Sequence, residues 1–154
     1  SPRTEQLARA AAEGIADQLQ SVGLLAVEMF VLGNGDVFIN ELAARPHNSG
    51  HLTLRATARS QFELHIAAIC NLPLAGPVVP LLQPAVMTNL LGDLWQNAQP
   101  DWPALFQQPT GTLHLYGKEP RPSRKMGHLI HTAPSPEQAL ADANTAYQSL
   151  IPKS

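Results

Sequence analysis

Residues 24–43 read LLAVEMFVLGNGDVFINELA and decide the fold of this chain. Two apolar segments flank Asn34-Gly35, the dipeptide that most strongly signals a two-residue type I′ turn. The stretch therefore predicts an antiparallel β-hairpin, and counting outward from its turn places Glu28 directly opposite Glu41.

In this count Gly33 faces Asp36, and the two glutamates share one face of the hairpin with apolar residues: Ala26, Phe30, Leu32, Val37, Ile39 and Ala43. Their carboxylates would stand about 5 Å apart. Like charges so placed repel each other, and removal from water adds to the cost. A shared proton, a nearby basic side chain or a divalent cation could relieve the repulsion, and the sequence that follows favours the cation.

The run ARPHNSGH, residues 44–51, is dense in groups that contact phosphates, carboxylates or an imidazole ring. Together with GLLAVEMF at 23–30 and NELA at 40–43, it resembles the N5-carboxyaminoimidazole ribonucleotide synthetases, ATP-grasp ligases of purine biosynthesis. Later segments fit the same family in the same order: SQFE at 60–63, NLLG at 89–92, YGK at 116–118 and RPSRKMGH at 121–128. The joint pattern is far more specific than a carboxylate pair alone.

The resemblance implies a nucleotide site on the hairpin. Glu28 and Glu41 would hold Mg²⁺ against the phosphates of ATP, since this cation prefers carboxylate and phosphate oxygens. Asn40 and Glu41 would contact ATP, and Arg45 would act in catalysis by steadying an anionic intermediate. Two simpler alternatives stay open: solvent-facing strand carboxylates, and a local ion pair between Arg45 and Glu41. Ala43 stands where the superfamily often has Asn, which argues against a full two-metal site.

The resemblance also implies a substrate site. His47 and Asn48 would face the aminoimidazole ring, with loop-stabilising hydrogen bonds as the alternative role. Related enzymes bind the ribonucleotide 5′-phosphate with a basic loop that here contains Lys118, Arg121, Arg124 and Lys125. From charge patterning alone, such a loop is a solvated surface. His47 and His51 are four apart, but Pro46 and Gly50 argue against a helix there, and no zinc motif is formed.

Composition narrows the partners of this chain. The formal charge is −2 over 154 residues, which gives no general attraction to nucleic acid or membranes. No apolar run approaches the roughly 18 residues that span a bilayer. The single cysteine, Cys70, cannot form an internal disulfide and is expected in the core. We therefore expect small-molecule partners and a cytoplasmic location, and the family implies a homodimer.

The expected fold class is α+β. Residues 1–73 should form the C-terminal part of an ATP-grasp domain, an antiparallel hairpin sheet with helices. A proline-rich linker over 74–84 should lead to a small α/β C-terminal subdomain over 85–154. Within this frame we expect helices over 4–20, 60–70 and 135–151, strands over 86–91, 110–116 and 128–132, and a short helix with a loop over 92–109.

The function implied by the resemblance is ATP-dependent carboxylation. ATP would phosphorylate bicarbonate to carboxyphosphate, and 5-aminoimidazole ribonucleotide would capture the carboxyl group, giving N5-carboxyaminoimidazole ribonucleotide, ADP and phosphate. The chain lacks the family's N-terminal domain and lid, so we interpret it as an inactive C-terminal fragment. One alternative is a formate-dependent glycinamide ribonucleotide transformylase, which shares the Glu…Glu…Arg-Pro-His framework. Another is a non-catalytic module for binding or dimerisation.

Overall fold

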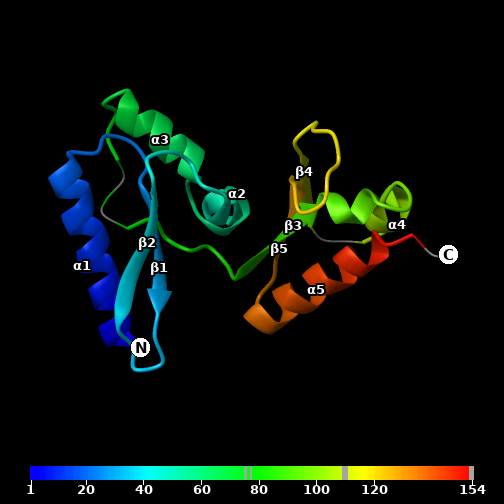
Figure 1. Ribbon diagram of the computed structural model, residues 1–154, viewed down its shortest axis with the longest axis horizontal. Helices are drawn as coiled ribbons and strands as arrows, with labels where there is room; N and C mark the ends of the chain where they lie inside the picture. Colours follow the sequence, from blue (N-terminus) through cyan, green and yellow to red (C-terminus); the bar gives the residue numbers. More distant parts are fainter. Residues whose placement is uncertain (75, 77, 109–110, 153–154) are drawn as a thin grey trace. The chain divides into compact units, whose positions relative to one another are not determined.

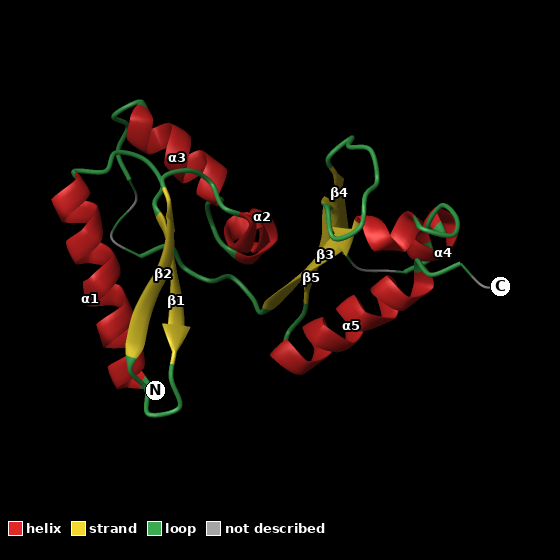
Figure 2. Cartoon of the chain, in the orientation of Figure 1, coloured by secondary structure: helices red, strands yellow, loops and turns green. Residues whose placement is uncertain are grey.

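The computed structural model describes residues 1–74, 76, 78–108 and 111–152, and these form two compact units. Unit 1 contains Ser1–His51 and Arg59–Val79, and unit 2 contains Leu52–Ala58 and Pro80–Ser154. Helices and small antiparallel sheets make up both units, which confirms the α+β class (Figures 1 and 2). Within the described residues, no helix is long and apolar enough to cross a membrane.

Unit 1 is built around the predicted hairpin. Strand β1 (Ala26–Val31) pairs with β2 (Val37–Ala43), and helix α1 (Pro2–Leu19) lies alongside them (Figure 1). The helix starts two residues earlier than expected, because the Ser1 hydroxyl accepts a hydrogen bond from the Thr4 N–H at 3.2 Å. Helix α1 thus covers one face of the hairpin.

The hairpin turn differs from the prediction. Leu32, not Gly33, faces Asp36, and its N–H donates to the Asp36 carbonyl at 2.9 Å. The Gly35 N–H donates to the Leu32 carbonyl at 2.9 Å, and Gly35 has a φ of +88°. This is a three-residue loop that ends in a left-handed glycine. The Asn34 side chain, which accepts from the Asp36 N–H at 3.0 Å, favours it over the two-residue turn.

A β-bulge further along the hairpin restores the predicted pairing. Met29 faces Ile39, whereas Glu28 faces Glu41, so Asn40 is an extra residue in β2. The longer loop shifts the register by one residue, and the bulge shifts it back. Glu28 and Glu41 are therefore facing partners, as predicted.

Between the loop and the bulge, the assignment of residues to faces was wrong. Phe38 faces Phe30 and shares the face of the glutamates, where the two rings are 55% and 59% exposed. Ile39 was expected on that face but lies with Leu42 on the other one. Both line an apolar groove with Ile15 and other residues of α1. The three-residue loop causes this exchange, because a one-residue slip moves each side chain to the opposite face.

The chain after the hairpin is more helical than expected. A 3₁₀ helix, η1 (Asn48–Leu52), runs into the short helix α2 (Thr53–Ala56). Pro46 precedes this helix rather than interrupting it, and proline is compatible with a position ahead of a helix. Gly50 is tolerated within a single short turn. The expectation of a non-helical segment was therefore wrong for residues 48–51.

Helix α3 (Gln61–Ile69) begins with the predicted capping box. The Ser60 hydroxyl accepts from the Glu63 N–H at 3.2 Å, and the Glu63 carboxylate accepts from the Ser60 N–H at 2.8 Å. Cys70 follows the last helical residue and is exposed, so its predicted place in the core was wrong. It lies at a helix end rather than on a buried helical face.

Unit 2 contains a three-stranded antiparallel sheet in the order β3-β5-β4. Besides α2, unit 2 contains β3 (Ala85–Leu91), η2 (Gly92–Trp95), α4 (Trp102–Phe106), β4 (Thr112–Leu115), β5 (Lys125–Thr132) and α5 (Pro136–Ser149). The elements from β3 onward match the expected ones, except that β5 begins three residues early and β4 ends one residue early. Residues 109 and 110, included in the prediction, lie outside the described residues.

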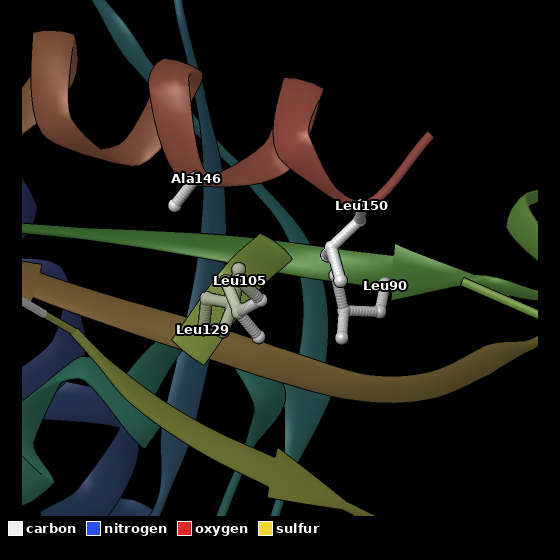
Figure 3. Packing of buried hydrophobic residues seen from close by; sticks show 5 residues of the cluster. All are labelled: Leu90, Leu105, Leu129, Ala146 and Leu150. Carbon is white, nitrogen blue, oxygen red and sulfur yellow. The ribbon is translucent and has the colours of Figure 1, made fainter. Parts of the chain in front are cut away.

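The core of unit 2 lies between the sheet and α5. Figure 3 shows Ala146 of α5 and Leu150, the residue that caps this helix, over Leu90 of β3, with Leu129 of β5 and Leu105 of α4 beside them. None of these five residues is more than 6% exposed. Burying a leucine side chain is worth roughly 1.5–3 kcal/mol, so the four leucines of this cluster fix the sheet from which the 116–125 loop extends.

The capping box predicts an acid dependence of stability. Hydrogen bonds from the Ser60 main-chain N–H and hydroxyl hold the pKa of Glu63 below its ordinary value of 4.5. Because this pKa is lower in the folded chain than in the unfolded chain, the charged carboxylate stabilises the fold at pH values above 4.5. This stabilisation is lost as the pH falls through the pKa of the folded state. The melting temperature of Glu63→Gln should therefore lie below that of the parent chain at neutral pH, and this difference should become smaller as the pH is lowered.

The matched control for this experiment is Glu13→Gln, which removes one exposed acidic charge from α1. The difference in melting temperature between Glu13→Gln and the parent chain should stay constant over the same pH range. A deficit for Glu63→Gln that stays constant down to low pH would contradict the capping role of the charged carboxylate.

Candidate functional site

The facing glutamates form the centre of the candidate site in unit 1. Glu41 is exposed, and the side chain of Glu28 is 43% exposed. The expected desolvation of both carboxylates is therefore not observed in this chain. His47, which we expected to face the aminoimidazole ring, contacts one of these carboxylates instead. Its Nε2 lies 3.0 Å from Glu28 Oε1, and this contact relieves part of the repulsion between the glutamates.

His47 lies just past the second strand and uses both ring nitrogens. Its side chain is only 16% exposed. Nδ1 lies 2.8 Å from the Ser49 hydroxyl and accepts a longer contact from the Ser49 N–H at 3.4 Å. Because a main-chain N–H can only donate, Nδ1 is the acceptor and Nε2 carries the proton toward Glu28. With Nδ1 accepting, the Nε2–H of His47 donates a hydrogen bond to the Glu28 carboxylate.

Gln61 joins this site although the sequence analysis treated it only as the start of a helix. It is 2% exposed, and its carboxamide contacts the His47 main chain and the His51 ring. The His51 ring also stacks on Phe62 at a centroid distance of 5.5 Å. A glutamine directly after an N-cap Ser60 is usually solvated, so only the fold reveals its contacts.

The remaining predicted residues of unit 1 differ in exposure, since Arg45 and Asn40 are exposed and Asn48 is half-buried. Arg45 is exposed and donates to the Pro46 carbonyl at 3.1 Å. The ion pairs formed by the described residues include none between Arg45 and Glu41. Asn40 is the exposed bulge residue, so simple strand alternation no longer fixes its face, and Asn48 is the first residue of η1.

The oxygen donors of the hairpin suit a hard cation only in part. Glu28 and Glu41 share one face and offer carboxylate oxygens, the ligands that Mg²⁺ prefers. In the described part of the chain, no group of three or more His, Cys, Asp or Glu is arranged to hold a metal ion by itself. A cation at this hairpin therefore needs further oxygen ligands, and Mg²⁺ obtains them from the water molecules that it retains or from phosphate groups.

The second predicted site, the 116–125 loop of unit 2, is tied to the end of β3. The Ser123 N–H donates to the Asp93 carboxylate at 2.6 Å, and the Gly92 N–H donates to the Arg124 carbonyl at 2.8 Å. A Cβ at Gly92 would lie 1.9 Å from the Arg121 carbonyl oxygen. The close approach requires glycine at this position, and this anchor was missed from the sequence.

The four cations of this loop differ in their surroundings. The Lys118 ammonium lies 5.1 Å from the centre of the Tyr116 ring, a cation–π contact. Arg124 is half-buried and donates to the Glu119 carbonyl at 3.2 Å. Arg121 and Lys125 are exposed. The structure therefore places all four predicted basic residues on one anchored loop and its adjoining strand.

A cluster of Tyr116, His114 and the buried His128 supports the base of the loop. Burial raises the pKa of the Tyr116 phenol above its ordinary value of 10.0, so a protonated hydroxyl lies 2.6 Å from His128 Nδ1. The His128 ring stacks on His114 with centroids 4.6 Å apart. These contacts fix Tyr116, and with it the start of the loop.

Comparison with known proteins identifies the class first. The ATP-grasp domain family matches residues 1–62, and the family called phosphoribosylaminoimidazole carboxylase C-terminal domain matches residues 85–142. The chain is therefore an ATP-grasp protein. Within this class, the chain belongs to the N5-carboxyaminoimidazole ribonucleotide synthetase family, as its similarity to members of that family shows.

Two of these relatives are N5-carboxyaminoimidazole ribonucleotide synthases. That of Bacillus subtilis is 48% identical over 126 residues, covering 81% of this chain and 32% of the relative. That of Escherichia coli is 49% identical over 115 residues, covering 75% of this chain and 30% of the relative. The chain thus spans about a third of the length of these relatives.

Solved structures agree with this assignment. The synthetase from Thermotoga maritima superposes with a TM-score of 0.84 at 40% identity, covering 96% of this chain and 42% of that one. An ADP complex of a synthetase superposes with a TM-score of 0.83 at 44% identity, covering 96% and 38%. The family resemblance inferred from sequence motifs is confirmed.

The anchor at Gly92 predicts a specific effect of Gly92→Ala. The added methyl group must push the Arg121 carbonyl away, which breaks the hydrogen bonds of Ser123 and Arg124 described above. A net hydrogen bond is worth about 0.5–1.5 kcal/mol, so hydrogen exchange of the Ser123 amide should accelerate about two- to tenfold.

Gly14→Ala is the matched control, because Gly14 lies in α1 with nothing within 4 Å of an added Cβ. It should leave the exchange of Ser123 unchanged and stabilise the helix slightly. Unchanged exchange of Ser123 in Gly92→Ala would show that the loop is not held at this point.

Proposed function

We propose that this chain supplies the C-terminal part of a ligase that uses ATP and bicarbonate to carboxylate 5-aminoimidazole ribonucleotide. Bicarbonate takes the terminal phosphoryl group of ATP and becomes carboxyphosphate, with release of ADP. The exocyclic amine then captures the carboxyl group or released CO₂, giving phosphate and N5-carboxyaminoimidazole ribonucleotide. The observation that carries the proposal is the facing pair of Glu28 and Glu41 beside the run 44–51.

The similar proteins favour this function over the transformylase. The relatives named above are synthases of N5-carboxyaminoimidazole ribonucleotide. A related structure from Aspergillus clavatus, 35% identical, is a complex with ADP and 5-aminoimidazole ribonucleotide. This support also weighs against a module that only binds or dimerises.

In this proposal the hairpin residues neutralise charge. Carboxylate oxygens of Glu28 and Glu41 hold Mg²⁺, which when bound offsets the negative charge of the ATP phosphates. Asn40, as the exposed bulge residue next to Glu41, contacts ATP. The exposed guanidinium of Arg45 steadies the anionic carboxyphosphate, for which a permanent positive charge and a planar donor set are suited.

The substrate residues belong to two segments. His47 and Asn48 border the aminoimidazole ring. The 5′-phosphate binds to Lys118, Arg121, Arg124 and Lys125, whose loop is anchored strongly enough to present its cations together. A hydrogen bond to a charged group is worth roughly 1.5–3 kcal/mol, so each such contact adds substantially to substrate affinity.

We propose the same organisation as the motifs predict: an ATP-grasp part over 1–73, a linker over 74–84 and a C-terminal subdomain over 85–154. The family matches to 1–62 and 85–142 support it. We further propose a cytoplasmic enzyme that acts as a homodimer on small molecules and does not bind nucleic acid or membranes. The low formal charge of −2 supports the last point.

The metal role is tested in the full-length enzyme with Glu28→Gln and Glu41→Gln. Each variant loses one ionic ligand, so each should weaken apparent Mg²⁺ affinity at least about tenfold and suppress bicarbonate-dependent ATP hydrolysis. Glu13→Gln should behave like the parent enzyme. Unchanged Mg²⁺ dependence in both hairpin variants would rule out the metal role.

A further inference from the structure

The carboxamide of Gln61 pairs with the main chain of His47 in both directions. Gln61 Oε1 accepts from the His47 N–H at 2.9 Å, and Nε2 donates to the His47 carbonyl at 2.8 Å. Main-chain groups cannot exchange donor and acceptor roles, so the orientation of the carboxamide is fixed. Nε2 also lies 2.8 Å from His51 Nδ1, which therefore accepts its second hydrogen.

The segment 47–50 is shaped to receive this side chain. The Gly50 N–H donates to the same His47 carbonyl at 3.0 Å. A Cβ at Gly50 would lie only 2.4 Å from Gln61 Oε1, so any larger residue would displace the carboxamide. Because Gln61 is only 2% exposed, its hydrogen bonds are stronger than the same bonds would be in water. The turn is thus closed against Gln61.

The hydrogen bonds from Gln61 to the main chain of His47 determine where the His47 ring points. With the main chain of His47 held, Nδ1 meets Ser49, and Nε2 meets Glu28 Oε1 at 3.0 Å. The bond engages one oxygen of Glu28, whose carboxylate faces Glu41 across the hairpin. In metal sites, hydrogen bonds to a ligating carboxylate orient it, and losing them lowers metal affinity about 10–100-fold.

We propose that Gln61 is a positioning residue that acts through His47 to orient the Glu28 carboxylate toward a divalent cation shared with Glu41. The cation itself rests on the function proposed above. The orientation of His47 does not, since it follows from contacts within unit 1. The two parts can therefore be tested separately.

The first measurement needs no metal. Long-range ¹H–¹⁵N spectra of the 154-residue chain, recorded at a mildly alkaline pH where histidine is neutral, report which ring nitrogen carries the proton. His47 should carry it on Nε2 in the parent chain. In Gln61→Met, which keeps the side-chain length but removes the hydrogen bonds of the carboxamide to His47 and His51, His47 should show a mixture of both tautomers. Gln6→Met, at an exposed position in α1, is the matched control and should leave His47 unchanged.

The second measurement uses Mg²⁺ alone and follows the side-chain carboxyl ¹³C shifts of Glu28 and Glu41. In the parent chain both should move together on titration, and Gln61→Met should raise the required Mg²⁺ concentration about 10–100-fold. If neither glutamate responds in the parent chain, the metal role in the proposed function fails. In that case the proposal that Gln61 helps to orient Glu28 toward a cation also fails. The tautomer measurement still decides whether Gln61 controls the orientation of His47.

Two results overturn the positioning role itself. One is a His47 proton on Nδ1 in the parent chain, which needs no variant and so does not depend on how Gln61→Met folds. The other is a folded Gln61→Met chain in which His47 keeps a pure Nε2–H tautomer. Lower thermal stability together with an unchanged tautomer would mean that Gln61 only holds the turn together.

Discussion

The antiparallel pairing of β1 with β2 is the constraint on which the candidate site depends. It sets Glu28 opposite Glu41, and it holds the end of β2 where the following turn can bring His47 to Glu28. A slip of one residue would move one glutamate to the face covered by α1. The register is therefore a functional feature, and the β-bulge at Asn40 is part of it.

The two units solve the same problem of placing charged groups on a small scaffold. In unit 1, a buried carboxamide closes a turn and leaves the charged carboxylates near water. In unit 2, an apolar core under α5 fixes the sheet, and Asp93 with the end of β3 fixes the basic loop. Both use main-chain hydrogen bonds to a side chain, which hold a loop without covering it.

Much of this architecture is readable from sequence, since apolar periodicity, the capping box and the proline at the start of α5 predict most elements. The facing glutamates were also predicted, but through two errors that cancel. A three-residue loop around Asn34 and Gly35 and a bulge at Asn40 are both invisible to simple counting. Gln61 could not be found because it bonds to His47, a residue 14 positions away, and no local pattern records such a contact.

Disulfide trapping tests the central register most directly. In a Cys70→Ala background, Glu28→Cys with Glu41→Cys should form an intramolecular disulfide under mild oxidation. Facing strand residues have Cβ atoms roughly 4.5–5.5 Å apart, so a small shift brings them to the roughly 3.5–4.5 Å that a disulfide needs. Glu28→Cys with Ile39→Cys should not, since Ile39 faces Met29 on the other side of the hairpin. Cross-linking of the second pair and not the first would contradict the register, and with it the account of the site.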